Sequence, residues 1–304
     1  MIFARTLLLC LVLAGCDARR AQAPDWVRSA PAGALTAVSF RTDWALQQPR
    51  LRTLLEGYPM AGRSLDLFLV RARLPLRREA GRLTVYLTRP GAGFLIQLGG
   101  FRDPGGLQVA IADGFPMDTK APDNRDHPVF VILDLPPYHI RAMADGDGRV
   151  WLGDQAMLAG LAAGKSPSAA ALAASAGWIN GAAAIQGFIR PKALLADHSG
   201  MLPGELSRNL PRGIEAVAWG VTPGPSPDGP NGFELSLAGS REAVQLSSPW
   251  LQRLLAAVCA MQGASTQWPE LLQETSRIGL RCQLSQEQVD VAMARLDQPP
   301  LPCH

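Results

Sequence analysis

The feature that most limits how this chain can fold is a series of short apolar runs that recurs, in the same order, in both halves. Glycine and proline, which end strands and form turns, separate the runs. The shared order indicates a tandem duplication, and chance matches in a chain rich in alanine, glycine and leucine are the alternative. The aligned stretches are GALTAVSFRTDWAL (from Gly33) with GAAAIQGFIRPKAL (from Gly181), GRLTV (from Gly81) with GIEAV (from Gly213), and GFLIQLGG (from Gly93) with GFELSLAG (from Gly232).

The order of elements in each half predicts a mixed module. In the first half, a β-type run at 34–40 precedes an amphipathic helix at 44–55, and strands follow at 65–74, 83–88 and 94–98. We therefore expect an α+β protein of two related modules, residues 31–164 and 165–304, with antiparallel sheets and packed helices. The gapless first alignment also predicts that Phe40 and Phe188 occupy equivalent buried positions.

Local signals predict further elements. An Asp-Gly turn near residue 146 indicates a hairpin, and residues 155–163 indicate a helix that ends at Gly164. The pair Ser248-Pro249 predicts the start of a helix over 250–261. A capping box that begins at Ser285 predicts a final helix.

The first fifteen residues have the layout of a secretory signal peptide. Arg5 precedes an apolar run from Leu7 to Gly15. The run is shorter than the about 20 apolar residues that a membrane-spanning helix needs. We therefore expect residues 1–15 to be removed.

The residues Leu13-Ala14-Gly15-Cys16 resemble the lipobox of bacterial lipoproteins. The resemblance implies cleavage before Cys16, a diacylglycerol on its thiol and an acyl chain such as palmitate on the new amino group. Two or three acyl chains anchor a protein stably in a membrane, and residues 16–30 would be the lipidated tether. An ordinary secretory signal with an incidental cysteine is the alternative.

The expected location follows from the anchor. A lipoprotein of this kind faces the periplasm from the cell envelope. Asp17 favours retention at the inner membrane, because many Gram-negative bacteria use an aspartate there as a retention signal. The outer membrane remains open.

The remaining cysteines permit one disulfide. Cys10 leaves with the signal peptide and Cys16 is lipidated, so Cys259, Cys282 and Cys303 remain in an oxidising compartment. We expect Cys259 to pair with Cys282, because the apolar segment that holds Cys282 should return beside the helix that holds Cys259. No Cys/His spacing in the sequence indicates a metal site.

An arginine-rich stretch is the best candidate contact surface. Within residues 71–89 the sequence holds six arginines and one acid. Arginines beside an anionic membrane each contribute about 1 kcal/mol to binding, so these side chains are candidates for anionic lipid or partner contact; a solvated sheet face is the alternative. The candidate residues are Arg71, Arg73, Arg77, Arg78 and Arg82.

No motif in the sequence indicates catalysis or a cofactor. Asp197-His198-Ser199 has the residue types of a hydrolase triad, but sequence neighbours do not relay protons, and no G-x-S-x-G elbow is present. Asp145, Asp147 and Asp154 suggest a calcium loop but lack its glutamate, which favours a solvated turn. Without Arg5 the chain has 28 basic and 26 acidic residues, so its charge does not favour nucleic acid.

These observations favour a membrane-anchored envelope lipoprotein with a non-enzymatic binding or scaffold role. Its expected partners are the membrane, through the lipid anchor, and other envelope proteins. The paired modules resemble uncharacterised bacterial envelope proteins built from two αβ modules, a resemblance over most of the mature chain that implies no activity. An anchored periplasmic hydrolase and a small-ligand binding protein are the alternatives.

Overall fold

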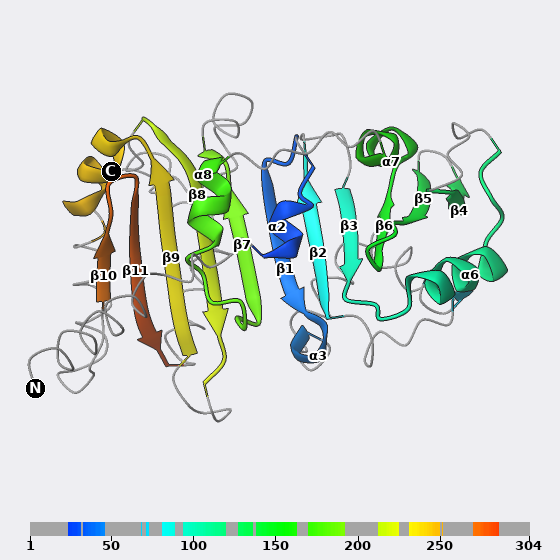
Figure 1. The fold of residues 1–304 in the computed structure, drawn as a ribbon, viewed down its shortest axis with the longest axis horizontal. Helices are drawn as coiled ribbons and strands as arrows, with labels where there is room; N and C mark the ends of the chain where they lie inside the picture. The colour runs from blue at the N-terminus through cyan, green and yellow to red at the C-terminus, as the bar shows by residue number, and fades with distance from the viewer. Residues whose placement is uncertain are drawn as a thin grey trace, which may run out of the picture.

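A single antiparallel sheet dominates the computed structural model of the chain (Figure 1). The structure describes residues 24–31, 33–45, 68, 71–72, 81–88, 94–119, 127–135, 138–162, 170–191, 212–224, 231–249, 251 and 270–285. The predicted signal peptide, most of the tether and the predicted final helix lie outside these residues.

The described strands form one 11-stranded sheet in the order β10-β11-β9-β8-β7-β1-β2-β3-β6-β5-β4. Every neighbouring pair is antiparallel. The strands are β1 (Thr36–Arg41), β2 (Arg82–Leu87), β3 (Phe94–Gly99), β4 (Val129–Leu135), β5 (Tyr138–Ala144), β6 (Arg149–Gly153), β7 (Ile185–Ile189), β8 (Ile214–Thr222), β9 (Asn231–Gly239), β10 (Glu270–Gln273) and β11 (Arg277–Leu284).

The expected fold class, α+β with two related modules of antiparallel sheets and packed helices, is wrong: the structure is mostly one antiparallel sheet with a few short helices. The first strands of the two halves, β1 and β7, pair with each other, so one sheet runs through both halves. The helices with stated bounds are short: α2 (Asp25–Arg28), α3 (Thr42–Ala45), α6 (Pro104–Gly114), α7 (Gln155–Ala162) and α8 (Ala170–Ala176). Alternating apolar residues indicate a strand but not its partner, which is why the pattern did not show the β1–β7 pairing.

The two halves have the same strand order, but Phe40 and Phe188, which the gapless alignment matches, do not occupy equivalent positions. Outward from the β1–β7 pair, the order is β1-β2-β3-β6 on one side and β7-β8-β9-β11 on the other. Phe188 pairs with Ala37, whereas Phe40 pairs with Ile185. Since alternate residues of a strand point to opposite faces, Phe40 and Phe188 lie on opposite faces. The equivalence predicted for these two residues is therefore wrong.

Several local predictions are confirmed and two are wrong. The runs at 34–40, 83–88 and 94–98 form β1, β2 and β3, and the helix predicted at 155–163 is α7. The predicted strand at 65–74 is wrong where it is described, because residues 68 and 71 are helical. A helix already covers residues 241–249, so the predicted helix start at Ser248-Pro249 is wrong. Of the helix predicted at 44–55, residues 44 and 45 belong to α3, and residues 46–55 lie outside the described residues.

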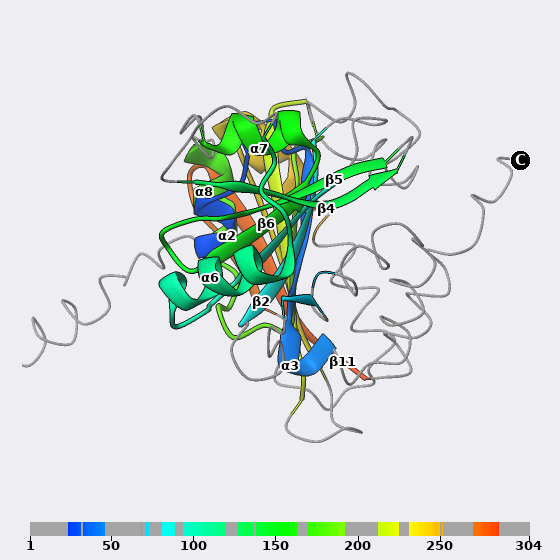
Figure 2. The same cartoon turned by 90° about the vertical axis from the view of Figure 1, so that its right-hand side faces the viewer.

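The two faces of the sheet have separate cores. One face, here called the helix face, carries Tyr86, Leu95 and Phe188, which pack with residues of α2, α7 and α8. Figure 2 shows these three helices on one side of the sheet. The opposite face carries two apolar clusters, one around Phe130 and Leu98 and one around Leu237 and Ile278. Within the described residues, no helix is long and apolar enough to cross a membrane.

Candidate functional site

A row of polar side chains crosses the helix face of the sheet. Its members pair directly with one another from strand to strand, so they share one face. All but Arg281 and the glycine are buried polar side chains. We call this set the polar row: Arg281 (β11), Glu234 (β9), Gly220 (β8), Gln186 (β7), Ser39 (β1), Thr84 (β2) and Gln97 (β3).

Hydrogen bonds from neighbouring segments satisfy the centre of the polar row. The Nε1 group of Trp26 donates to Oε1 of Gln186 at 2.7 Å. The Thr84 hydroxyl donates to Oγ of Ser39 at 2.8 Å, and Nε2 of Gln97 donates to Oγ of Ser29 at 2.8 Å. Because an unsatisfied buried polar group costs about 1–3 kcal/mol, these partners explain how the row is tolerated inside the fold.

The short helix α2 is fastened across this row. The Trp26 ring stacks on Phe188 with ring centroids 5.9 Å apart. The buried hydroxyl of Tyr86 contacts the backbone carbonyl of Trp26 and lies 2.8 Å from Oε1 of Gln97. Burial raises the pKa of Tyr86, so its phenol stays protonated. The contacts of α2 therefore reach strands from both halves of the chain.

The far end of the polar row is an ion pair. Nε of Arg281 lies 2.8 Å from Oε1 of Glu234, and the backbone N–H of Asn180 donates to the other carboxylate oxygen at 2.5 Å. The Arg281 guanidinium also lies over the Trp178 ring, 4.5 Å from its centroid. This end of the row is thus compensated in charge.

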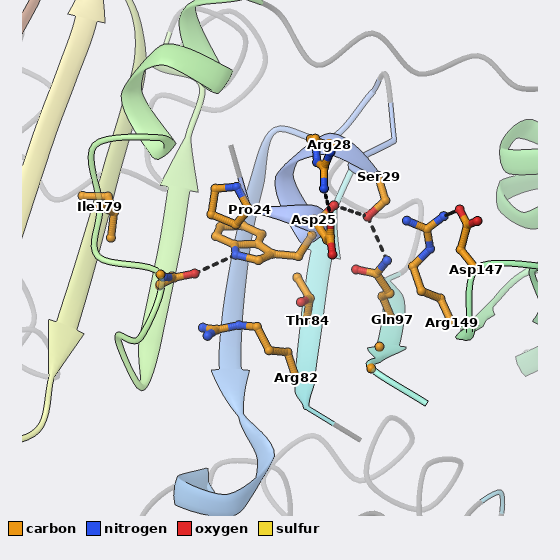
Figure 3. Close-up of a pocket in the computed structure, with 15 residues that line it drawn as sticks. Pro24, Asp25, Arg28, Ser29, Arg82, Thr84, Gln97, Asp147, Arg149 and Ile179 are labelled. Carbon is orange, nitrogen blue, oxygen red and sulfur yellow. Dashed lines mark hydrogen bonds and ion pairs between the residues drawn. The ribbon is translucent and has the colours of Figure 1, made fainter. Parts of the chain in front are cut away.

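A pocket of about 830 Å³ opens beside α2, over strands β2 and β3 (Figure 3). We call it the α2 pocket. Its volume lies within the range of about 300–1,000 Å³ that is typical of small-molecule sites. The lining residues are Pro24, Asp25, Trp26, Arg28, Ser29, Arg82, Thr84, Gln97, Gly99, Gly100, Asp147, Arg149, Ile179, Gly181 and Gln186.

Two of the three arginines that line the α2 pocket have carboxylate partners. Arg28 is paired with Asp25. Arg149 is paired with Asp147 and, through Nε at 2.7 Å, with Asp145. The acids of the pocket wall are therefore engaged with cations of the same wall.

Among the described residues, the third arginine, Arg82, forms hydrogen bonds with uncharged groups alone. Its guanidinium donates to the side chain and carbonyl oxygens of Ser39 and to the carbonyl oxygen of Ala183. Burial, and secondarily the nearby charge of Arg41, lowers the pKa of Arg82 to about 10. Arg82 is still a cation at neutral pH, in a partly buried position.

The structure places some of the predicted site residues and leaves others undescribed. Cys16 and Cys259 lie outside the described residues, and Cys282 is buried in β11, so the lipid anchor and the disulfide stay predictions. Arg73, Arg77 and Arg78 are also outside. Arg71 lies over the ring of Phe115, whereas Arg82 is on the helix face; the structure does not bring these two arginines together.

The aspartates of the suggested calcium loop have structural partners. Asp145 Oδ1 accepts from the backbone N–H groups of Asp147 and Arg149, each at 3.0 Å. Asp154 caps α7 by accepting from the N–H of Met157 at 2.8 Å. Among the described residues, no group of three or more His, Cys, Asp or Glu side chains is placed to hold a metal ion.

Sequence reasoning singled out Arg82 but missed the rest of the pocket. The lining residues of the pocket come from α2, from β2 and β3 and from turns near residues 147 and 181. No local sequence pattern predicts that these segments lie together. One signal was present: Ser39, Gln97 and Gln186 each have apolar residues or glycine on both sides within their strands. A polar residue on a buried face needs a partner, so these positions could have marked the polar row.

Comparisons with known proteins do not assign the chain to a family. No family model matches it, and no curated protein matches it. Among solved structures, crystal form III of TP0453 is similar at a TM-score of 0.41 and 10% identity, covering 88% of this chain and 97% of that chain. Crystal form I of TP0453 is similar at 0.40 and 11%, covering 88% and 98%. TM-scores of this size do not establish that the two proteins share a fold.

Proposed function

We propose that this chain is a lipid-anchored envelope protein that binds a small polar ligand in the α2 pocket and has no catalytic role. The observation that carries the binding role is the pocket itself: about 830 Å³, lined by hydrogen-bonding side chains and by an arginine with uncharged partners. The lipobox at Cys16 supports the anchor.

The chemistry of the wall favours binding over catalysis. General acid–base catalysis needs a group free to exchange a proton with the substrate. The two acids that line the α2 pocket, Asp25 and Asp147, are both paired with arginines. The remaining polar groups of the described lining are hydroxyls, amides and guanidinium groups. A hydroxyl acts as a nucleophile only with an adjacent base, and the described carboxylates of the wall are paired with arginines.

The position of the pocket in the chain connects it to the anchor. Pro24, the first described residue, lines the pocket and is the eighth residue after Cys16. An extended chain spans at most about 3.6 Å per residue, so Pro24 lies within roughly 30 Å of an acyl group on Cys16. In an anchored protein, the edge of the pocket that Pro24 forms therefore lies within roughly 30 Å of the membrane-inserted acyl chains.

Two measurements test the proposal. Cys16→Ser should abolish fatty-acid labelling of the chain and move it out of the membrane fraction, or leave the signal peptide attached. A thermal-shift screen of the anchored chain in detergent, with neutral, cationic and anionic polar compounds, should find a class that raises the melting temperature without being consumed. Intact labelling of Cys16→Ser would remove the anchor, and steady turnover of a stabilising compound would favour the hydrolase alternative.

A further inference from the structure

The guanidinium of Arg82 has hydrogen-bonding capacity left over. A guanidinium carries five N–H donors. Three bonds to described residues use Nε with Oγ of Ser39 at 2.9 Å, Nη2 with the Ser39 carbonyl at 3.2 Å, and Nη1 with the Ala183 carbonyl at 3.1 Å. Among the described residues this leaves one donor on each terminal nitrogen, and a bidentate anion takes up two such donors.

The positive charge of Arg82 also has no carboxylate partner among the described residues. Arg82 pairs across the strands with Arg41, a second cation. Asp43 neutralises Arg41 through a contact of 2.5 Å, and no carboxylate of the described residues forms an ion pair with Arg82. The other two described arginines of the wall, Arg28 and Arg149, are paired with aspartates. Among the described lining residues, Arg82 is therefore the arginine whose charge has no paired carboxylate.

We infer that the α2 pocket binds a small polar molecule through one singly charged oxyanion, a carboxylate or a phosphodiester, held by the guanidinium of Arg82. This inference rests on the proposed binding function and names the ligand class. A partly buried cation gains most from a counterion where water is scarce. One negative charge balances Arg82, whereas a dianion would bring a second negative charge for which the described residues hold no unpaired cation in this wall.

The rest of the wall suits the uncharged body of such a ligand. Thr84 and Gln97 lie on the floor beside Arg82, and Ser29 lies above them on the turn after α2 (Figure 3). Gly99 and Gly100 of the same wall have no side chains, which leaves room beside Arg149. Thr84 and Gln97 are already hydrogen-bonded to Ser39 and Ser29, so this part of the wall offers the ligand body space and van der Waals contact rather than free hydrogen-bond partners.

The ligand has two available sources that share this chemistry. A free metabolite with a carboxylate or phosphodiester could enter from solution. The head group of an anionic lipid offers the same phosphodiester, and the short distance from Cys16 brings the pocket near the membrane surface.

The test uses the full lipidated chain in nanodiscs of phosphatidylcholine, with affinities from ligand-observed NMR. The probes are glycerophosphoglycerol as a soluble phosphodiester, gluconate as a carboxylate, and glucose as a neutral control. At least one anion should bind measurably tighter than glucose. Arg82→Gln should weaken it at least about tenfold, because the charge-assisted bonds are lost, and Arg82→Lys should retain part of the affinity. Arg277→Gln, a variant far along the sheet in β11, should leave it unchanged.

The outcomes separate the inference from the proposed function. Discs that also contain phosphatidylglycerol will compete with the soluble probe if the lipid is the source, and will leave its affinity unchanged if the ligand is free. Either result supports the inference, provided that Arg82→Gln keeps the far-ultraviolet spectrum of the unaltered chain. Glucose binding as tightly as the anions, or equal affinity in folded Arg82→Gln, would overturn the ligand class while leaving a binding function in place. Absence of binding by all three probes would overturn the inference.

Discussion

Gly187 occupies a position where any side chain would collide with Trp219. The two residues pair directly between β7 and β8. A Cβ atom added at Gly187 would lie 2.4 Å from the Cε2 and Cζ2 atoms of the Trp219 ring. The indole therefore packs on the bare backbone of β7, which is one strand of the β1–β7 pair that joins the halves.

We predict that Gly187→Ala lowers the free energy of unfolding by about 1–3 kcal/mol, the usual cost of overpacking. Urea denaturation measures the change. Gly33→Ala is the matched control, since a Cβ there meets nothing within 4 Å. In the background of Trp219→Leu the Gly187→Ala cost should shrink. Equal effects of Gly187→Ala and Gly33→Ala would contradict this packing.

A buried ion pair offers a second test at the residue scale. Nε of Arg141 lies 2.6 Å from Oδ2 of Asp118, and both side chains are almost fully buried. Arg141→Met should cost about 3–5 kcal/mol, because it removes the guanidinium from a buried carboxylate. Arg277→Met, whose partner Glu274 is exposed, should cost at most about 1 kcal/mol. Similar costs for the two variants in urea denaturation would count against the buried pair.

At the scale of elements, α2 joins the two halves of the chain despite its four residues. Trp26 stacks on Phe188 of β7 and bonds to Gln186, while its carbonyl contacts Tyr86 of β2. Since the same helix also lines the α2 pocket, its attachment fixes the shape of the proposed ligand site.

We predict that Trp26→Phe costs about 1–3 kcal/mol, because the ring stacking is kept but Oε1 of the buried Gln186 loses its donor. The variant should also weaken binding of the anionic probe. Trp219→Phe is the control for binding, because Trp219 packs with the cluster on the opposite face and does not line the pocket. Probe affinity that falls equally in both variants would show that α2 has no special part.

The elements themselves could be predicted from sequence, but their assembly could not. The strands β2 and β3 and the helix α7 follow from local apolar spacing, which needs no knowledge of distant residues. The contact of Trp26 with Gln186 joins residues 160 positions apart. The arginine-rich stretch 71–89 predicts that Arg82 belongs to a contact surface shared with Arg71. The β1–β2 register instead turns Arg82 toward Ser39 and the pocket.

At the scale of the whole molecule, the continuous sheet predicts that the described halves unfold together. β1 is hydrogen-bonded to β2 on one side and to β7 on the other. The helix-face core also contains residues from both halves, among them Tyr86 and Phe188. A separation at residue 164 would expose both β1 and β7 along their paired edges.

We therefore predict one cooperative transition in urea, with the same midpoint by far-ultraviolet circular dichroism and by tryptophan fluorescence. Fragments 31–164 and 165–304, expressed separately, should not reach the stability of the joined chain. Two transitions with different midpoints, or two fragments that fold with undiminished stability, would contradict the continuous core.

Native mass spectrometry of the chain, extracted from membranes in mild detergent, detects both the lipid anchor and a bound ligand in one experiment. We predict a covalent mass for residues 16–304 plus a diacylglycerol and an amino-linked acyl chain. We also predict a non-covalent adduct, singly negative in solution, that is absent from Arg82→Gln. A chain that begins at Met1, or at Cys16 without acyl mass, would contradict the lipid anchor. An adduct of equal occupancy in the unaltered chain and in Arg82→Gln would contradict the α2 pocket as its binding site.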